Sequence, residues 1–255
     1  MKKLVITLFA AFSLLITSAQ QTRLVSDPEA TFRQAKEFYQ KEYYSLAYPL
    51  FRELNLNLRE TDRSNNALNF QEIKYYTIVL ALKQNEAGAV DAAREYVDLD
   101  DNAARVDMMS FHLAEYHFRK ENYPEAASYY EKTFVEHLSN REIADMKFHQ
   151  GYAYFNMQRF DMARPLFDVI RQLPKDPNYI DANYYYGFIA FNDKSYNEAL
   201  TAFTVVENDP DYAAVIPFYI ANIYYYTGQK DKAIVINPAE VIHAFSQMDW
   251  LATHL

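Results

Sequence analysis

The pattern that decides the fold reads GYAYFNMQRFDMARPLF at residues 151–167 and GFIAFNDKSYNEALTAF at residues 187–203. In both stretches a glycine precedes an alanine by twelve residues, and aromatic residues stand three positions before that alanine and four positions after it. Small residues allow two helix backbones to cross closely, while large ones fill the space around the crossing. The pattern therefore predicts a helix, a tight turn and a second helix that packs back on the first.

The same spacing recurs along the chain, at intervals of roughly 34 residues after a longer first interval. Each crossing pairs a small residue of the first helix with an alanine of the second: Ala35 with Ala47, Ala81 with Ala93, Ala114 with Ala126, Gly151 with Ala163, Gly187 with Ala199 and Ala221 with Ala233. Such a period indicates stacked helical hairpins. We expect an all-α array of about six repeats over residues 28–236, starting near residues 28, 74, 107, 144, 180 and 214.

These residues resemble the tetratricopeptide repeat (TPR) family, whose pattern combines small residues in both helices with aromatic residues around them. The fourth and fifth repeats fit best, through Gly151, Tyr154, Phe160, Ala163 and Phe167 and through Gly187, Tyr196, Ala199 and Phe203. The second repeat departs at Gln84, the sixth at Lys230 and Asn237, and no repeat has the usual early tryptophan. The resemblance implies a right-handed α-solenoid whose concave face is lined by the first helix of each repeat, and a role in protein contacts rather than catalysis.

In this register, three positions of each first helix face the concave side or its edge, and they are mostly aromatic. The candidate groove residues are Phe111, Phe118, Phe148, Tyr152, Phe155, Tyr184, Phe188, Phe191, Phe218 and Tyr225. Aromatic side chains are frequent anchors at binding surfaces. Stripes at helical spacing also belong to helix cores, so we expect roughly half of the concave-face aromatic set to pack between helices.

Two kinds of ligand remain open for such a groove. A peptide or helix segment of another envelope protein would suit a continuous aromatic stripe, which gives an interaction scaffold as the first hypothesis. The alternative is a glycan- or peptidoglycan-binding module, or the N-terminal part of a larger envelope protein, since the same rings could stack on sugars. The net charge of −9 argues against nucleic acid, which requires a basic face.

The first 19 residues read as a secretory signal peptide. Lys2 and Lys3 precede the apolar run 4–16, and residues 17–19 offer small side chains for cleavage, so the mature chain would begin near Gln20. A retained membrane anchor is the alternative, although the run is short for a span. We therefore expect an exported bacterial protein, periplasmic or associated with the outer membrane, with no stable span after cleavage. The chain has no cysteine, which excludes disulfides and an N-terminal lipidated cysteine.

Two segments break the period. Residues 55–66 are mostly polar and account for the long first interval, so we expect a solvated surface loop. Asn237 and Pro238 interrupt the second helix of the sixth repeat, and the segment 237–255 that follows is strongly apolar. This segment could be an atypical C-terminal capping helix, a truncated end, or a surface for another domain.

No motif for catalysis or cofactor binding is present, so we expect no catalytic residue, no metal and no cofactor. His117 and Glu121 have helical spacing for two metal ligands but lack a third. The acidic run Asp98, Asp100 and Asp101 lacks the glycine and the later glutamate of a calcium loop.

Overall fold

The computed structural model describes residues 27–57 and 67–235 of the 255-residue chain. Within these ranges all regular structure is helical, so the all-α prediction is confirmed. The signal peptide, most of the polar insertion at 55–66 and the segment 237–255 lie outside the described residues, and what the sequence predicts for them stays a prediction.

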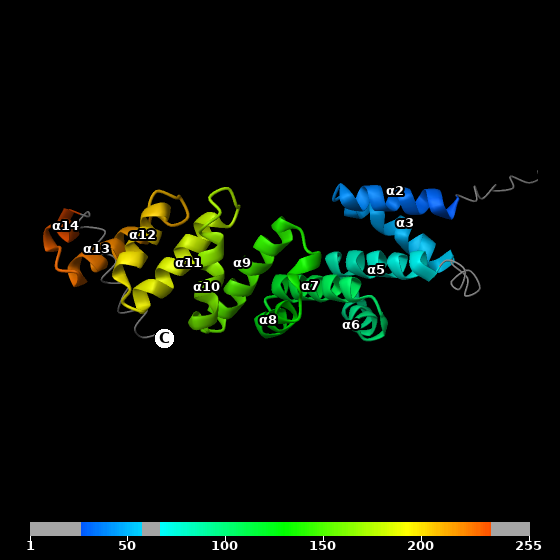
Figure 1. Cartoon of the computed structure of the whole chain (residues 1–255). Helices are drawn as coiled ribbons and strands as arrows, with labels where there is room; N and C mark the ends of the chain where they lie inside the picture. The colour runs from blue at the N-terminus through cyan, green and yellow to red at the C-terminus, as the bar shows by residue number, and fades with distance from the viewer. Residues whose placement is uncertain (1–26, 58–66, 236–255) are drawn as a thin grey trace, which may run out of the picture. The chain divides into compact units, whose positions relative to one another are not determined.

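The described helices form consecutive pairs along the chain (Figure 1). The α-helices are α2 (Pro28–Gln40), α3 (Tyr44–Asn57), α5 (Ala67–Lys83), α6 (Ala89–Leu99), α7 (Ala103–Arg119), α8 (Tyr123–Glu131), α9 (Asn140–Asn156), α10 (Phe160–Ile170), α11 (Tyr179–Asn192), α12 (Tyr196–Val206), α13 (Ile216–Tyr226) and α14 (Lys230–Val235), and a short 3-10 helix η1 spans Val135–His137. Two compact units divide the chain, Met1–Thr77 and Ile78–Leu255, with the boundary inside α5.

The first unit holds α2, α3 and the beginning of α5. Ala35 and Ala47 are fully buried, which is what a close crossing of α2 and α3 requires. The ring of Phe51 in α3 stacks on Tyr76 of α5, with 4.8 Å between the centroids. Lys36 of α2 forms a 2.7 Å ion pair with Glu72 of α5. Apolar stacking and one ion pair therefore hold the start of α5 against the first helix pair.

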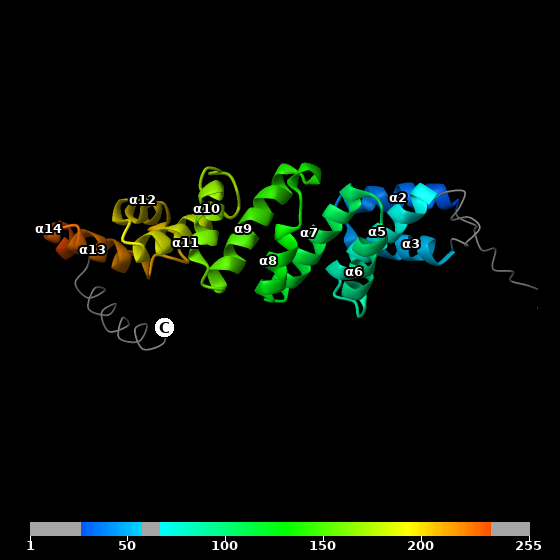
Figure 2. The same ribbon diagram turned by 60° about the horizontal axis from the view of Figure 1, so that its bottom comes forward.

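The second unit stacks the later helix pairs in chain order, as Figures 1 and 2 show for α7 to α14. Ala126, Ala163 and Ala199 are fully buried at the predicted crossings. An added β-carbon at Gly187 would lie 2.7 Å from the ring of Phe203, and one at Gly151 would lie 3.1 Å from Phe167. Glycine therefore permits the close approach of α11 to α12, and the predicted stacking of helical hairpins is confirmed.

The turn inside most repeats has a left-handed residue at the end of the first helix. Glu42, Glu121, Gln158 and Lys194 have φ between 56° and 61°, and Gly228 has φ 78°. The amide that follows each one bonds back into the helix, as in the 2.8 Å bond from Ser195 N–H to the carbonyl of Ala190. This bond satisfies a carbonyl that the helix end would otherwise leave open. Because this turn recurs with the same geometry, each second helix runs back along the first helix of its repeat.

Three first helices begin earlier than the repeat period places them. α5 begins at Ala67, α7 at Ala103 and α9 at Asn140, each several residues before the expected repeat start. For α9 the reason is local, because Ser139 and Glu142 form a reciprocal capping box. The period locates helix crossings, whereas capping residues locate helix ends.

Candidate binding site

Rings from the first helices of four successive repeats lie in contact across the second unit. Tyr152 of α9 lies between Phe118 of α7 and Tyr185 of α11, with centroid distances of 5.8 and 5.2 Å. The contacts continue from α9 through α11 to α13: Phe155 to Phe188 at 5.4 Å, Phe188 to Tyr219 at 6.1 Å and Phe191 to Tyr219 at 5.2 Å. We call these seven residues the aromatic ladder. Most of its contacts are edge-to-face, a favourable geometry for aromatic pairs.

The structure places the predicted groove residues at different depths. Phe111 and Phe148 are buried, with 6% and 7% of their surface exposed, so they pack in the core. Tyr225 is the opposite case, at 58% exposure. The remaining seven are half-buried: Phe118, Tyr152, Phe155, Tyr184, Phe188, Phe191 and Phe218. Half-buried rings combine a fixed position with surface that a partner can cover.

Two ladder residues, Tyr185 and Tyr219, are absent from the sequence-based set. The ring of Tyr185 stacks on Phe167 at 5.3 Å, and the ring of Tyr219 stacks on Phe203 at 5.1 Å. In both cases a first helix contacts the second helix of the preceding repeat. Burial raises the pKa of both phenols well above the usual range, so they stay neutral. A signal in the sequence could have found them, because each tyrosine stands two positions before the small residue at the helix crossing, Gly187 or Ala221.

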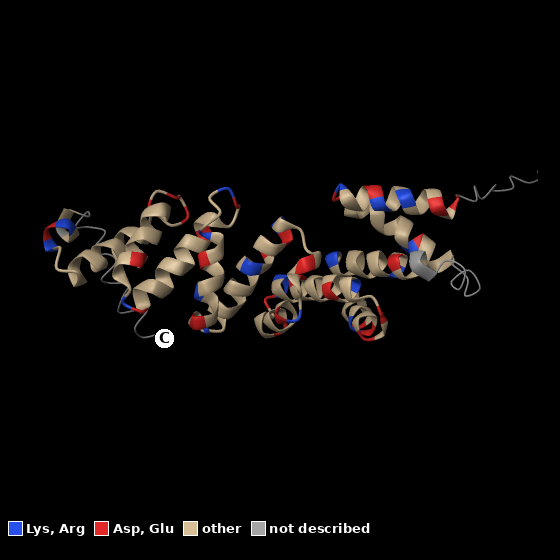
Figure 3. Ribbon diagram, viewed as in Figure 1, with Lys and Arg blue, Asp and Glu red and all other residues tan. Residues whose placement is uncertain are grey.

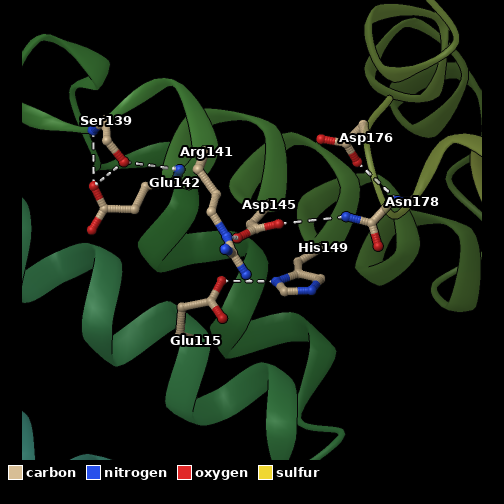
Figure 4. Close-up of polar contacts among 8 residues, drawn as sticks. All are labelled: Glu115, Ser139, Arg141, Glu142, Asp145, His149, Asp176 and Asn178. Carbon is tan, nitrogen blue, oxygen red and sulfur yellow. Dashed lines mark hydrogen bonds and ion pairs between the residues drawn. The ribbon is translucent and has the colours of Figure 1, made fainter. Parts of the chain in front are cut away.

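Two carboxylates of the first helices, Glu115 near the end of α7 and Asp145 near the beginning of α9, take part in a group of polar contacts (Figure 4). Glu115 of α7 is 2.9 Å from His149 of α9, and the hydroxyl of Tyr130 donates to Glu115 at 2.6 Å. Burial opposes ionisation of Glu115, but the bonds with His149 and Tyr130 outweigh it and lower its pKa. His149 also stacks on the ladder residue Phe118 at 4.2 Å. This cluster fastens α7, α8 and α9 together.

Asp145 lies in the same region with weaker partners, as Figure 4 shows. Asn178 is 3.5 Å from it, and the exposed Arg141 is 3.8 Å away. Burial raises the pKa of Asp145, and although His149 and Arg141 oppose this, Glu115 adds to it. Asp145 therefore carries a negative charge that its surroundings only partly offset.

Figure 3 shows that α11 and α13 are almost free of charge. α13 contains no charged residue, and Asp181 is the only one in α11. The hydroxyl of Tyr212 donates to Asp181 at 2.5 Å, and its ring stacks on Tyr184 at 4.3 Å. The surface at this end of the ladder is therefore apolar and aromatic.

An open pocket of about 490 Å³ lies where α11, α12 and α13 meet. It is lined by Phe191, Asn192, Lys194, Tyr196, Phe218, Asn222 and Tyr226. The amide groups of Asn192 and Asn222 donate to carbonyls one turn earlier in their own helices, at 3.0 and 2.8 Å. The pocket thus combines aromatic walls, two oriented amides and one lysine.

Neither metal binding nor membrane spanning is supported by the described residues. Across 27–57 and 67–235, no group of three or more histidine, aspartate or glutamate side chains could hold a metal ion. In the same ranges no helix has the length and hydropathy needed to cross a bilayer. The candidate site is therefore a surface of rings, amides and a few charges.

Solved structures with a similar fold are TPR proteins. YrrB, described as a TPR protein with an unusual peptide-binding site, is 21% identical with a TM-score of 0.50, and the match covers 73% of this chain and 95% of YrrB. MamA AMB-1 is 17% identical with a TM-score of 0.51, covering 65% and 87%. A tetratricopeptide repeat protein from Parabacteroides merdae is 14% identical with a TM-score of 0.50, covering 86% and 79%.

No protein-family model matches the chain, and no curated protein matches it either. The likeness therefore concerns the fold, which is that of the tetratricopeptide-repeat proteins: a helical solenoid of stacked hairpin repeats. The resemblance predicted from the spaced alanines and aromatic residues is confirmed at this level.

Proposed function

We propose that this chain is an exported scaffold that binds a segment of another cell-envelope protein along the aromatic ladder. The observation that carries the proposal is the ladder itself, a series of rings that crosses α7, α9, α11 and α13 and is half-buried except at the buried Tyr219. Rings held this way offer contact area while losing little conformational freedom on binding. The chemistry of the face favours non-covalent binding rather than catalysis.

The ladder suits a polypeptide better than a sugar. Stacking on a sugar requires an open ring face, whereas the Tyr185 ring already stacks face to face on Phe167 and several ladder rings meet edge to face. An apolar side chain can instead fill the notches between such rings, as helix or strand ligands do in repeat-protein grooves. YrrB, with its unusual peptide-binding site, gives a precedent for peptide binding on this fold.

The envelope location rests on the N-terminal segment alone. A basic start, an apolar run and small residues before Gln20 form the expected order of a secretory signal. Expression in a bacterium, followed by fractionation and N-terminal sequencing, tests this part of the proposal. We expect a periplasmic protein that begins at or near Gln20; a cytoplasmic protein that retains Met1 contradicts export.

Capture of partners from envelope extract tests the ladder. The test variant is Phe155→Ala/Phe188→Ala, which removes two neighbouring rings outside the pocket. Since both rings also pack against other residues, a stability control is needed, and Ile170→Val supplies it by trimming a fully buried residue of α10. A second control, Phe134→Ala, removes a ring that is 62% exposed outside the ladder.

We expect the wild type and both controls to capture the same envelope protein and the ladder variant to lose it. Circular dichroism at the temperature of the experiment must show that all four proteins are folded. Unchanged capture by the folded ladder variant rules out the ladder as the binding surface. Binding to cell-wall sacculi that disappears in the ladder variant, with protein capture unchanged, indicates the glycan-binding alternative.

A further inference from the structure

The pocket between α11, α12 and α13 includes a lysine whose ammonium group has no ion-pair partner among the described residues. Lys194 lines the pocket from the turn between α11 and α12, where φ is 61°. The nearest acidic residues in sequence, Asp193 and Glu198, are both bound by Arg164. Among the described residues, the ammonium group of Lys194 has neither an ion-pair partner nor a hydrogen-bond partner.

The rest of the pocket is suited to a large apolar side chain. Phe191, Tyr196, Phe218 and Tyr226 supply ring surface, and the 490 Å³ volume lies in the range of ligand pockets. Tyr226 also stacks on Tyr196 at 5.5 Å, so this wall is held in place by a ring of the neighbouring helix. A pre-formed aromatic pocket is a typical place for the central anchor of an interface.

Asn192 and Asn222 add hydrogen-bonding groups at the same place. Each side-chain amide donates one N–H to its own helix, which fixes the orientation of the amide. Each therefore keeps a carbonyl oxygen and a second N–H, the two groups that pair with a peptide bond. A peptide chain crossing the pocket could bond to them while one of its side chains enters between the rings.

Carboxylates occur along most of the ladder, as Glu115 of α7, Asp145 of α9 and Asp181 of α11 show. At the pocket, Asp193 and Glu198 both bind Arg164, which leaves the ammonium group of Lys194 available to a ligand. This unpaired ammonium group favours a negatively charged group in the ligand at the pocket, in spite of the acidic balance of the whole chain.

We propose that this pocket is the anchor subsite of the scaffold and takes a large apolar side chain whose neighbours in the partner's sequence carry carboxylates. The anchor fills the space between Phe191 and Phe218, and a flanking glutamate or aspartate pairs with Lys194. This inference rests on the proposed function and adds to it where the anchor side chain of the partner binds and which chemical groups surround that side chain. The partner is a protein segment, and the negative group is a side chain rather than a chain terminus.

Synthetic peptides, acetylated and amidated so that they carry no terminal charge, test the subsite. Three peptides share the same flanking Gly/Ser sequence and differ only in their three central residues, which are Glu-Phe-Glu, Gln-Phe-Gln or Glu-Ala-Glu. NMR titration of the isotope-labelled full chain measures affinity and shows whether the side-chain amides of Asn192 and Asn222 shift. We expect Glu-Phe-Glu to bind there, about fivefold more tightly than Gln-Phe-Gln and at least tenfold more tightly than Glu-Ala-Glu.

Lys194→Gln is the matched variant, because Gln158 occupies the equivalent left-handed turn position in the preceding repeat. It should bind Glu-Phe-Glu and Gln-Phe-Gln equally, while keeping the preference for phenylalanine over alanine. Lys175→Gln, at an exposed position before α11, is the control and should behave as the wild type.

The inference is overturned if Glu-Phe-Glu shows no binding at millimolar concentration, if the wild type does not distinguish glutamate from glutamine, or if Lys194→Gln keeps that distinction. In each of these cases the proposed function stands as long as Phe155→Ala/Phe188→Ala still loses its envelope partner. Full capture by that ladder variant defeats the proposed function instead, whatever the peptides do.

Discussion

The ring of Tyr185 stacks on the ring of Phe167 at a centroid distance of 5.3 Å and an angle of 21°. Tyr185 belongs to the first helix of one repeat and Phe167 to the second helix of the repeat before it. The relationship recurs one repeat later, where Tyr219 stacks on Phe203 at 5.1 Å and 24°. Successive hairpins are thus joined by equivalent pairs of rings, and in each pair the tyrosine also belongs to the ladder.

The stacked pair should contribute a measurable coupling to stability. We expect the double-mutant cycle of Tyr185→Leu and Phe167→Leu to give a coupling free energy of about 0.5–1.5 kcal/mol in chemical denaturation. Leucine keeps apolar volume in place, so the coupling reports the stacking itself. Additive effects of the two substitutions would mean that the rings only fill space.

Gly187 should be the least tolerant of the four glycines to alanine. A β-carbon there would lie 2.7 Å from Phe203, against 3.1 Å from Phe167 at Gly151. We expect Gly187→Ala to destabilise the protein by about 1–3 kcal/mol through overpacking, and Gly151→Ala to cost less. Thermal unfolding of the two variants side by side checks the order; a reversed order would contradict the crossing geometry.

The left-handed turns provide a stabilising substitution. Gln158 has φ 57°, a conformation that costs a non-glycine residue about 1 kcal/mol. Gln158→Gly should therefore raise stability by roughly 0.5 kcal/mol, after allowance for the greater freedom of glycine in the unfolded chain. Gly228→Ala, at φ 78°, is the matched reverse change and should lower it. Denaturant midpoints measure both, and the same sign of change for both would refute this explanation.

Acid should weaken the Glu115–His149 contact. The pKa of Glu115 is lowered from its ordinary value of 4.5 in the folded chain, so the stability that its ionised form contributes is present above that value. That contribution is lost as the pH falls through the lowered pKa. We expect Glu115→Gln to reduce stability at pH 7 by about 1–3 kcal/mol and to reduce the acid dependence. An unchanged pH profile of unfolding would show that the contact is not part of the acid response.

Asp145 should respond with the opposite sign. Burial raises its pKa above the ordinary value of 3.8, so its ionised form costs folding free energy once the pH exceeds that value. We expect Asp145→Asn to stabilise the protein slightly at pH 7 and to have less effect near pH 3, where the carboxyl is protonated in both states. Destabilisation at pH 7 would mean that the Asn178 and Arg141 contacts outweigh the burial.

The fold could be predicted from the sequence because its determinants are short in range. Ala163 and Gly151 stand twelve residues apart within one helical hairpin, and both are buried where its two helices cross. The repeat period does not locate helix ends, as α9 shows by beginning at Asn140, where Ser139 and Glu142 form a capping box. Repeat periods carry no information about such ends.

The candidate binding face could be predicted only in part. Helical spacing predicts rings on one face of α9 and α11, but it could not rank Phe148, which is buried, against Phe155, which is half-buried. Burial depends on how closely the next repeat packs. Tyr185 and Tyr219 were missed for the same reason, since their importance lies in contacts with the preceding repeat.

The sequence by itself determined that this chain is an all-α repeat protein, because the spacing of small and large residues within each hairpin permits one way of packing it. The tertiary structure decided the arrangement of the candidate site. Glu115 meets His149 only because consecutive repeats stack, and Lys194, Phe218 and Tyr226 line one pocket only because three helices form it together. Contacts within a hairpin follow from local periodicity, whereas contacts between hairpins depend on the stacking geometry, which exists only once neighbouring repeats have packed.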